Sequence, residues 1–377
     1  MKKDNLIFIH RLLKSIGDAI ITVFIPLYIL KNTDSIILST SYLVLYTLFV
    51  IFCLFVFNHI IQKYGVFGLM LHFIPVISSE AILSFCPINI LTILIVAALM
   101  GLAQATYSIP INLVFAFGDK KTNVSKFQIA TNIGKLIFTF VSGFILSSEI
   151  KNSFLFLAIA SSLFYIASTF PIAFAYKELK QQYNSYHQNI EDKKLKPKVD
   201  IWFRLFHISF GLFQPIMDNV LPLYLYLVGR SFKAVTIVIV LVELFKILMN
   251  LLAKLMVHHQ KEKICVIIGS IIFMLSIIGL VFIPNPIILY ILSCTCSISF
   301  PLTFVPMFKK YCEYLKQTNN IIDGMTMRDF DIFSFRAPMF ALSYIGLLLY
   351  PSLLIGFLSV PIMLVSEIKI LNKQDYN

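Results

Sequence analysis

The chain of 377 residues is 58% hydrophobic and 13% charged, whereas about a quarter of the residues of a soluble domain are charged. This composition excludes most soluble enzymes. The net charge of +12 does not indicate a nucleic-acid partner, because the basic residues lie between apolar runs rather than on one face. The length allows roughly twelve membrane-spanning helices of about 20 residues each. The sequence therefore predicts an all-α polytopic membrane protein.

Apolar runs bounded by charged or turn residues follow one another along the chain. The first six are residues 6–30, 36–57, 66–85, 90–117, 127–146 and 154–176, and the last six are 201–228, 234–256, 264–283, 287–308, 329–350 and 352–365. A polar stretch separates the two sets. We interpret residues 1–176 as an N-terminal six-helix bundle, 177–200 as a cytoplasmic linker and 201–377 as a C-terminal six-helix bundle.

Most Lys and Arg residues of the connections fall on one side of the predicted membrane when alternate connections are compared. Positive residues collect on the cytoplasmic side, so both termini are predicted to be cytoplasmic. Short loops and a high content of Ile, Lys, Asn and Phe favour a bacterial inner (plasma) membrane, and a monomer is expected. The six cysteines show no CxxC or zinc-type spacing, so neither a metal site nor a cofactor is predicted.

Motifs in the first half recur in the second half in the same order. The matched pairs are Ile25-Pro26-Leu27-Tyr28 with Leu221-Pro222-Leu223-Tyr224, Ser108-Ile109-Pro110 with Ser299-Phe300-Pro301, and Lys135 with Arg336. The residue numbers differ by 196 (222 minus 26), 191 (301 minus 110) and 201 (336 minus 135). These similar offsets indicate duplication of a six-span unit, which predicts two pseudo-symmetric bundles around a cavity at mid-membrane.

Twelve spans, a charged central connection and this parallel repeat resemble the major facilitator superfamily over nearly the whole chain. The family's loop signature between spans two and three is reduced here to its spacing and its last glycine, Gly65, within residues 58–66. The resemblance implies that spans one, four, seven and ten line the solute path. It also implies that spans two, five, eight and eleven form the contact between the halves.

Ionisable groups inside a bilayer cost about 2.5 to 3.5 kcal/mol each on insertion scales, so they tend to face a cavity or a partner. The candidate substrate-path residues are Arg11, Lys14, Asp18, Gln104, Asn112, His207, Gln214, Asp218, Thr295 and Thr303. The candidate coupling or inter-bundle charges are Lys135, Glu243, Lys246 and Arg336.

Two of these charges have alternative interpretations. Asp18 is either a structural partner of Lys14, one turn earlier on the same face, or a protonatable gate or substrate contact. Glu243 pairs either with Lys246 on its own helix or with Lys135 across the contact between the halves. Glu80, near the end of the third span, is expected to reach the membrane interface.

The intramembrane cations favour an anionic or zwitterionic small organic solute. The main functional hypothesis is a secondary active transporter that works by alternating access and is coupled to protons, with the lipid bilayer and the solute as its partners. One alternative is a transporter-like protein without transport activity that serves in assembly or sensing. Another is an intramembrane aspartyl-type enzyme, because Ser15-Ile16-Gly17-Asp18 is similar to that class's Gly-x-Gly-Asp motif. The incomplete motif argues against an enzyme.

Overall fold

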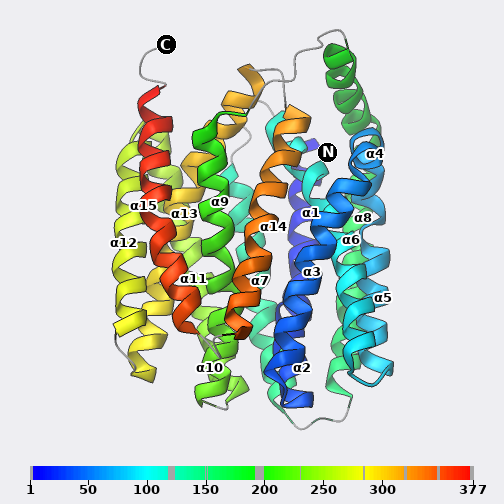
Figure 1. Cartoon of the computed structure of the whole chain (residues 1–377). Coiled ribbons are helices and arrows are strands. Elements are labelled where there is room, and N and C mark those ends of the chain that lie inside the picture. The colour runs from blue at the N-terminus through cyan, green and yellow to red at the C-terminus, as the bar shows by residue number, and fades with distance from the viewer. Residues whose placement is uncertain are drawn as a thin grey trace.

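The computed structural model of the protein is a bundle of helices that run roughly parallel to one long direction (Figure 1). The structure describes residues 3–117, 124–148, 150, 152–191, 199–229, 231–282, 285–317, 321–345 and 349–373. Within these ranges the regular structure is helical and contains no strand. Both described ends of the chain lie at the same end of the molecule, which we call the terminal end.

The N-terminal half contains six spans, two of which are built from more than one helix. The first consists of α1 (Lys3–Ile20), the 3₁₀ turn η1 (Thr22–Phe24) and α2 (Ile25–Thr33). It is followed by α3 (Ile36–Val56), by α4 (Asn58–Leu71) with α5 (Phe73–Phe85), and by α6 (Ile90–Phe117), α7 (Val124–Ser147) and α8 (Ser153–Glu191).

The C-terminal half repeats this order. Its first span consists of α9 (Ile201–Pro215), the π-helical turn η2 (Ile216–Val220) and α10 (Leu221–Gly229). It is followed by α11 (Phe232–His258), α12 (Glu262–Phe282), α13 (Pro286–Gln317), α14 (Ile321–Ile345) and α15 (Leu349–Lys373).

The helices of the two halves pack in the same pattern. In the N-terminal half α1 packs on α7 and α8, α6 packs on α3 and α5, and α5 packs on α8. In the C-terminal half α9 packs on α14 and α15, α13 packs on α11 and α12, and α12 packs on α15. Each pair occupies the position that the repeat assigns to it. The predicted architecture of twelve helices in two pseudo-symmetric bundles is therefore confirmed.

The two bundles meet mainly along two equivalent helix pairs, α3 with α14 and α7 with α11. Figure 1 shows α14 and α7 between the two bundles. A glycine permits the closest approach of the second pair: a Cβ atom at Gly143 of α7 would collide with the side chain of Thr236 of α11. Small residues allow helix backbones to approach closely inside a membrane.

The first and seventh spans depart from α-helical geometry at matching positions. The first changes at Ile21, with φ −132° and ψ −48°, before η1, and the seventh passes through η2 at residues 216–220. Residues 22–24 and 218–220 correspond at the offset of 196 found between Pro26 and Pro222. A proline removes a backbone donor and crowds the preceding turn, so both breaks lie where a proline disfavours a regular helix.

Several predicted boundaries differ from the structure because charge was taken as a sign of a loop. Helix α14 begins at Ile321 rather than at residue 329, and α15 spans Leu349–Lys373 rather than 352–365. Helix α8 continues to Glu191, inside the predicted linker. Charges near the predicted start of α14 are paired: Arg328 bonds to Asp329 at 2.6 Å, and Arg204 forms two bonds to Asp331, at 2.9 and 3.1 Å.

Candidate functional site: a charged cavity between the bundles

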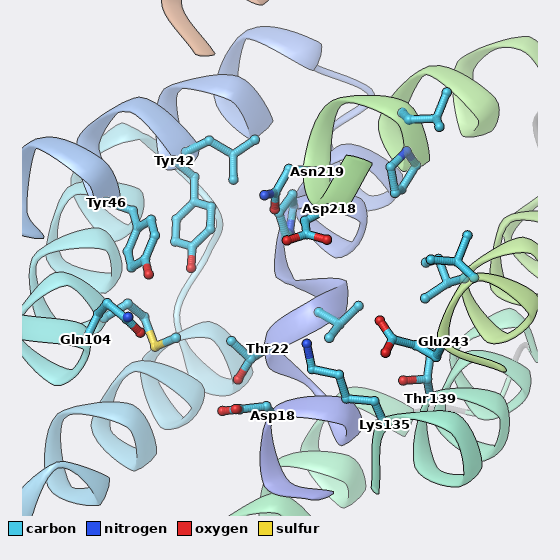
Figure 2. A pocket seen from close by; sticks show the side chains of 18 of the residues that line it. Asp18, Thr22, Tyr42, Tyr46, Gln104, Lys135, Thr139, Asp218, Asn219 and Glu243 are labelled. Carbon is cyan, nitrogen blue, oxygen red and sulfur yellow. The ribbon is translucent and has the colours of Figure 1, made fainter. Parts of the chain in front are cut away.

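A cavity of about 260 Å³ lies between the two bundles near their middle (Figure 2). The N-terminal half contributes lining residues from α1, η1, α2, α3, α6 and α7, and the C-terminal half from η2, α10, α11, α13 and α14. Spans one, two, four and five and their repeat partners seven, eight, ten and eleven therefore all contribute to its wall.

Seven acidic or basic side chains line this cavity: Lys14, Asp18, Lys135, Asp218, Glu243, Lys246 and Arg336. All seven were predicted from the sequence, together with Gln104, which also lines it. Charged groups at membrane depth are costly unless they meet a partner, water or a ligand. The way in which these charges pair therefore indicates what the cavity can bind.

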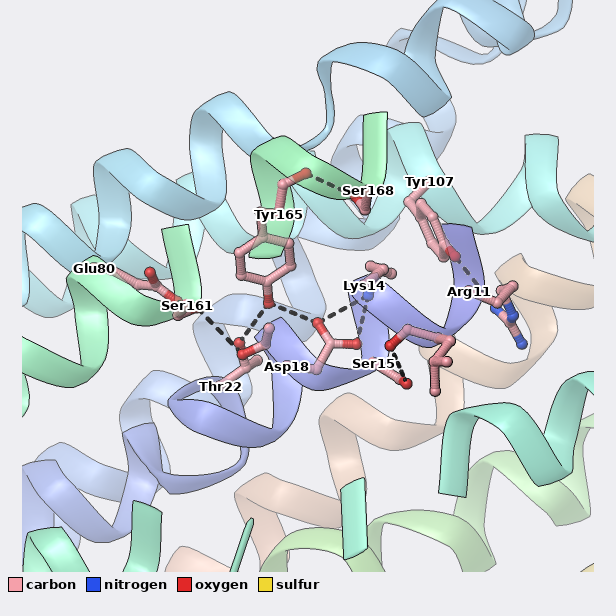
Figure 3. Close-up of polar contacts among 12 residues, drawn as sticks. Arg11, Lys14, Ser15, Asp18, Thr22, Glu80, Tyr107, Ser161, Tyr165 and Ser168 are labelled. Carbon is pink, nitrogen blue, oxygen red and sulfur yellow. Dashed lines mark hydrogen bonds and ion pairs between the residues drawn. The ribbon is translucent and has the colours of Figure 1, made fainter. Parts of the chain in front are cut away.

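Asp18 is held from two sides (Figure 3). The Lys14 ammonium lies 2.6 and 2.9 Å from the two carboxylate oxygens, and the Tyr165 hydroxyl of α8 donates to one of them at 2.7 Å. Tyr165 also shares a 3.0 Å hydrogen bond with Thr22 in η1. This geometry matches the structural pairing of Asp18 with Lys14, and the carboxylate still faces the cavity.

The two acids of the C-terminal half share one cation. The ammonium of Lys246 lies 3.1 Å from Glu243 and 3.3 Å from Asp218. Asp218 also accepts a 2.8 Å hydrogen bond from Gln214. The π-helical turn places Asp218 on the cavity wall opposite α11, so this network links the seventh span to the eighth.

The predicted contact between Lys135 and Glu243 is wrong for this conformation. Both side chains line the cavity, but Glu243 bonds to Lys246, three residues along the same helix. The short distance along one helix turn makes that pair easier to form than a pair across two helices. The Lys135 ammonium instead acts electrostatically on Asp18 and Asp218.

Two of the four cations that line the cavity, Lys135 and Arg336, form no ion pair with the residues that the structure describes. The Arg336 guanidinium donates to the Gln214 side chain and lies 4.7 Å above the Phe333 ring, while its Nε is buried without a partner in the described residues. The two cations are equivalent in the repeat, one on α7 and one on α14. The cavity therefore contains two positive charges that form no ion pair with its three acidic residues.

Several lining residues are uncharged and were not predicted. These are Thr22, Tyr42, Tyr46, Met100, Tyr107, Thr139, Asn219 and Ser293. Tyr42 and Tyr46 of α3 stack with ring centroids 6.2 Å apart, and their hydroxyls point toward the cavity in Figure 2. Their spacing of four residues, which places both rings on one face of the helix, was a signal that could have identified them.

Six predicted path residues do not line the cavity in this conformation: Arg11, Asn112, His207, Gln214, Thr295 and Thr303. Arg11 lies behind Tyr107 and donates to its hydroxyl at 3.4 Å. Gln214 lies behind the wall and bonds to two residues that form it, Asp218 and Arg336. These two residues therefore position the lining.

Three of the remaining polar side chains are hydrogen-bonded or packed elsewhere. Thr295 and Thr303 donate to carbonyls of their own helix, at 2.9 Å and 3.2 Å. His207 is buried, with its ring 4.5 Å from that of Tyr311. The polar residues in the sequence predicted which helices line the cavity. They did not predict which face of each helix points into it, because each helix has polar residues on more than one face.

Comparison with known proteins agrees with this architecture. The fold is similar to that of a bacterial homologue of the iron transporter ferroportin in an outward-facing state with soaked iron, with TM-score 0.69, 13% identity and coverage of 98% of this chain and 99% of that chain. It is also similar to the human organic anion transporter MFSD10 (TETRAN), with TM-score 0.64, 9% identity and coverage of 97% and 98%. At these identities the likeness shows the fold alone. No curated protein sequence matches the chain.

A helical membrane protein with two related bundles and a charged central cavity falls within the class of membrane transporters. The sequence matches the family model of the Major Facilitator Superfamily over residues 7–319. The chain belongs to the Major Facilitator Superfamily. It is accordingly a multi-pass membrane transporter and not an enzyme, so the aspartyl-enzyme alternative is not supported.

Proposed function

We propose that this protein is a secondary active transporter that moves a small organic anion or zwitterion by alternating access, with protons as the coupling ion. The observation that carries this proposal is the charge balance of the cavity. Its three acids are all engaged by Lys14 or Lys246, whereas Lys135 and Arg336 make no ion pair among the described residues. A carboxylate placed between them gains charge-assisted hydrogen bonds in a site of low dielectric.

Two further features support this substrate class. The cavity volume of about 260 Å³ suits a small organic molecule. The faces of Tyr42 and Tyr46 and the side chain of Met100 offer apolar surface beside the charges. An organic anion with a compact apolar part therefore fits the cavity better than an inorganic ion.

The two helix pairs between the bundles support alternating access. Rocking of one bundle against the other needs interfaces that can open at one end while they close at the other. Helix pairs α3 with α14 and α7 with α11 are equivalent in the repeat and flank the cavity on both sides. We further propose that the protein works as a monomer in a bacterial inner membrane, with the terminal end in the cytoplasm.

Uptake into proteoliposomes with an imposed pH gradient tests the proposed function. The panel contains benzoate and succinate as anions, phenylalanine as a zwitterion, and tetraphenylphosphonium as a cation. We expect accumulation of an anion or the zwitterion that depends on the gradient. Accumulation of the cation alone would contradict the proposed substrate class. Absence of binding and transport across the panel would favour a transporter-like protein without transport activity.

Substitution of the two unpaired cations tests their role in binding. Lys135→Gln and Arg336→Gln should each weaken binding of a transported anion about 10- to 100-fold, because each removes one charge-assisted contact. Lys254→Gln is the matched control, since Lys254 lies on α11 outside the cavity lining. Isothermal titration would measure the change, and an equal loss in the control would contradict the assignment.

A further inference from the structure

A second buried acid lies behind the cavity in the N-terminal bundle. Glu80 of α5 is 1% exposed, so the expectation that it reaches the membrane interface is wrong. One carboxyl oxygen is 2.8 Å from the Ser161 hydroxyl of α8, and the other is buried without a partner among the described residues. Glu80 does not line the cavity, and neither the ion pairs of the cavity nor the proposed substrate contacts use it.

No cation pairs with Glu80 in the part of the chain that the structure describes. Helices α6 and α8 pack against α5. The titratable groups of the packed helices that interact electrostatically with Glu80 are Tyr165 of α8 and Asp18 of α1. Lys14 is bonded to Asp18, and Asp18 is the charged group that acts on Glu80. A buried carboxylate with one hydroxyl donor and a negative neighbour is strongly disfavoured, so the neutral acid suits this site.

The Ser161 hydroxyl joins Glu80 to the break in the first span. Its oxygen lies 2.8 Å from Glu80 and 3.2 Å from the carbonyl oxygen of Gly17 (Figure 3). Gly17 lies in the last turn of α1, which ends at Ile20, and the last four carbonyls of a helix need partners outside it. The first span is therefore attached to α8 at the turn that carries Asp18.

A serine hydroxyl has one proton and cannot donate to both acceptors at once. If Glu80 is protonated, its O–H donates to Ser161, and Ser161 donates to the Gly17 carbonyl. If Glu80 is ionised, Ser161 must donate to the carboxylate, and the bond to Gly17 is lost. The protonation of Glu80 therefore decides whether Ser161 of α8 bonds to the Gly17 carbonyl at the end of α1.

We propose that Glu80 is a proton-binding site and that its proton controls the Ser161 bond to Gly17 at the break in the first span. This inference rests on the proposed proton coupling, and it names the group that binds the proton. Release of the proton loosens the turn next to Asp18 and Thr22, which line the cavity. The site thus connects proton binding to the shape of the substrate path without occupying that path.

The C-terminal bundle offers a matched control. Glu367 of α15 is also fully buried, accepts a 2.8 Å hydrogen bond from Ser270 of α12, and has a second oxygen without a partner among the described residues. Ser270 has no further hydrogen bond to a helix of the cavity in that part of the chain. Glu367→Gln therefore removes a similar buried acid but not the connection to the first span.

Infrared spectroscopy and hydrogen exchange on the purified full-length protein test the proposal without any solute. The wild type should show a carboxylic acid C=O band that disappears as pH rises, and Glu80→Gln should lack this component. Hydrogen exchange of the amides at residues 21–24 should become about tenfold faster over the same pH range, after correction for the intrinsic pH dependence of exchange. A tenfold change corresponds to the loss of one hydrogen bond. Glu80→Gln should abolish this pH-dependent increase, which we call the exchange step, and Glu367→Gln should retain it.

Ser161→Ala separates the two parts of the proposal, because it should keep the Glu80 band and abolish the exchange step. The proposal is overturned if the wild type has no titrating band, or if the exchange step persists in Glu80→Gln or in Ser161→Ala. These results are independent of transport. If the wild type shows the band and the step but no uptake driven by a pH gradient, the proposed coupling fails while the proton site stands.

Discussion

The tight contact between α7 and α11 leads to a prediction about the conformational equilibrium. Gly143 lies against the side chain of Thr236 near the end of the molecule opposite the terminal end, and a Cβ atom has no room there. Gly143→Leu should force the bundles apart at this end. Overpacking costs about 1 to 3 kcal/mol, which corresponds to a roughly 5- to 150-fold shift toward the conformation that is open on this side.

Labelling of a cysteine in the cavity measures this shift. Ser293 lines the cavity, so Ser293→Cys in a Cys86→Ser background provides the probe; the other five cysteines are buried. A membrane-impermeant maleimide added from the side opposite the terminal end should react faster in Gly143→Leu, by up to the same factor. An unchanged rate together with lower thermal stability would refute the reasoning.

A glycine inside one bundle supplies the control for this experiment. A Cβ atom at Gly279 of α12 would lie 2.8 Å from the Leu292 side chain of α13, and both helices belong to the C-terminal bundle. Gly279→Leu should therefore lower thermal stability without faster labelling. If it accelerates labelling as much as Gly143→Leu does, the effect reflects general loosening rather than opening between the bundles.

Two more predictions concern the polar networks. Tyr165→Phe removes the hydroxyl that donates to Asp18, and it should cost about 1 to 3 kcal/mol of stability, measured as a lower thermal midpoint in detergent; an unchanged midpoint would argue against this bond. Double-mutant cycles on stability should give a coupling of about 0.5 to 3 kcal/mol for Glu243 with Lys246, and a smaller one for Glu243 with Lys135. The reverse order would show that the contact across the bundles exists.

The spans could be predicted because a bilayer demands long apolar helices with satisfied backbones. The error at α14 has a physical reason. Arg328, just before the predicted start at residue 329, looks like a loop residue in a sequence, yet it bonds to Asp329 at 2.6 Å, and Asp331 bonds to Arg204 on α9. One pair within α14 and one pair between α14 and α9 neutralise these charges. Hydropathy does not register such pairing.

The cavity charges could be predicted for a related reason. Rare ionisable residues at membrane depth are functional or paired by default, which correctly selected Lys14, Asp18 and Asp218 as lining residues. The rotation of each helix could not be obtained in this way. Thr295 donates to the backbone of its own helix and lies outside the cavity lining, whereas Tyr46 lines the cavity although tyrosine is common in membrane helices. Only the packing of neighbouring helices distinguishes these two outcomes.

The irregular turns of the first and seventh spans divide each span into a long helix and a short helix. The short helices, α2 and α10, contain nine residues each. Each short helix meets its long helix at a break where the regular backbone hydrogen bonds are already interrupted. Rotation of the short helix about this break therefore costs few additional hydrogen bonds inside the bilayer. Since both copies carry the break at the same level, the cavity can widen by the displacement of two short helices while most of each bundle stays rigid.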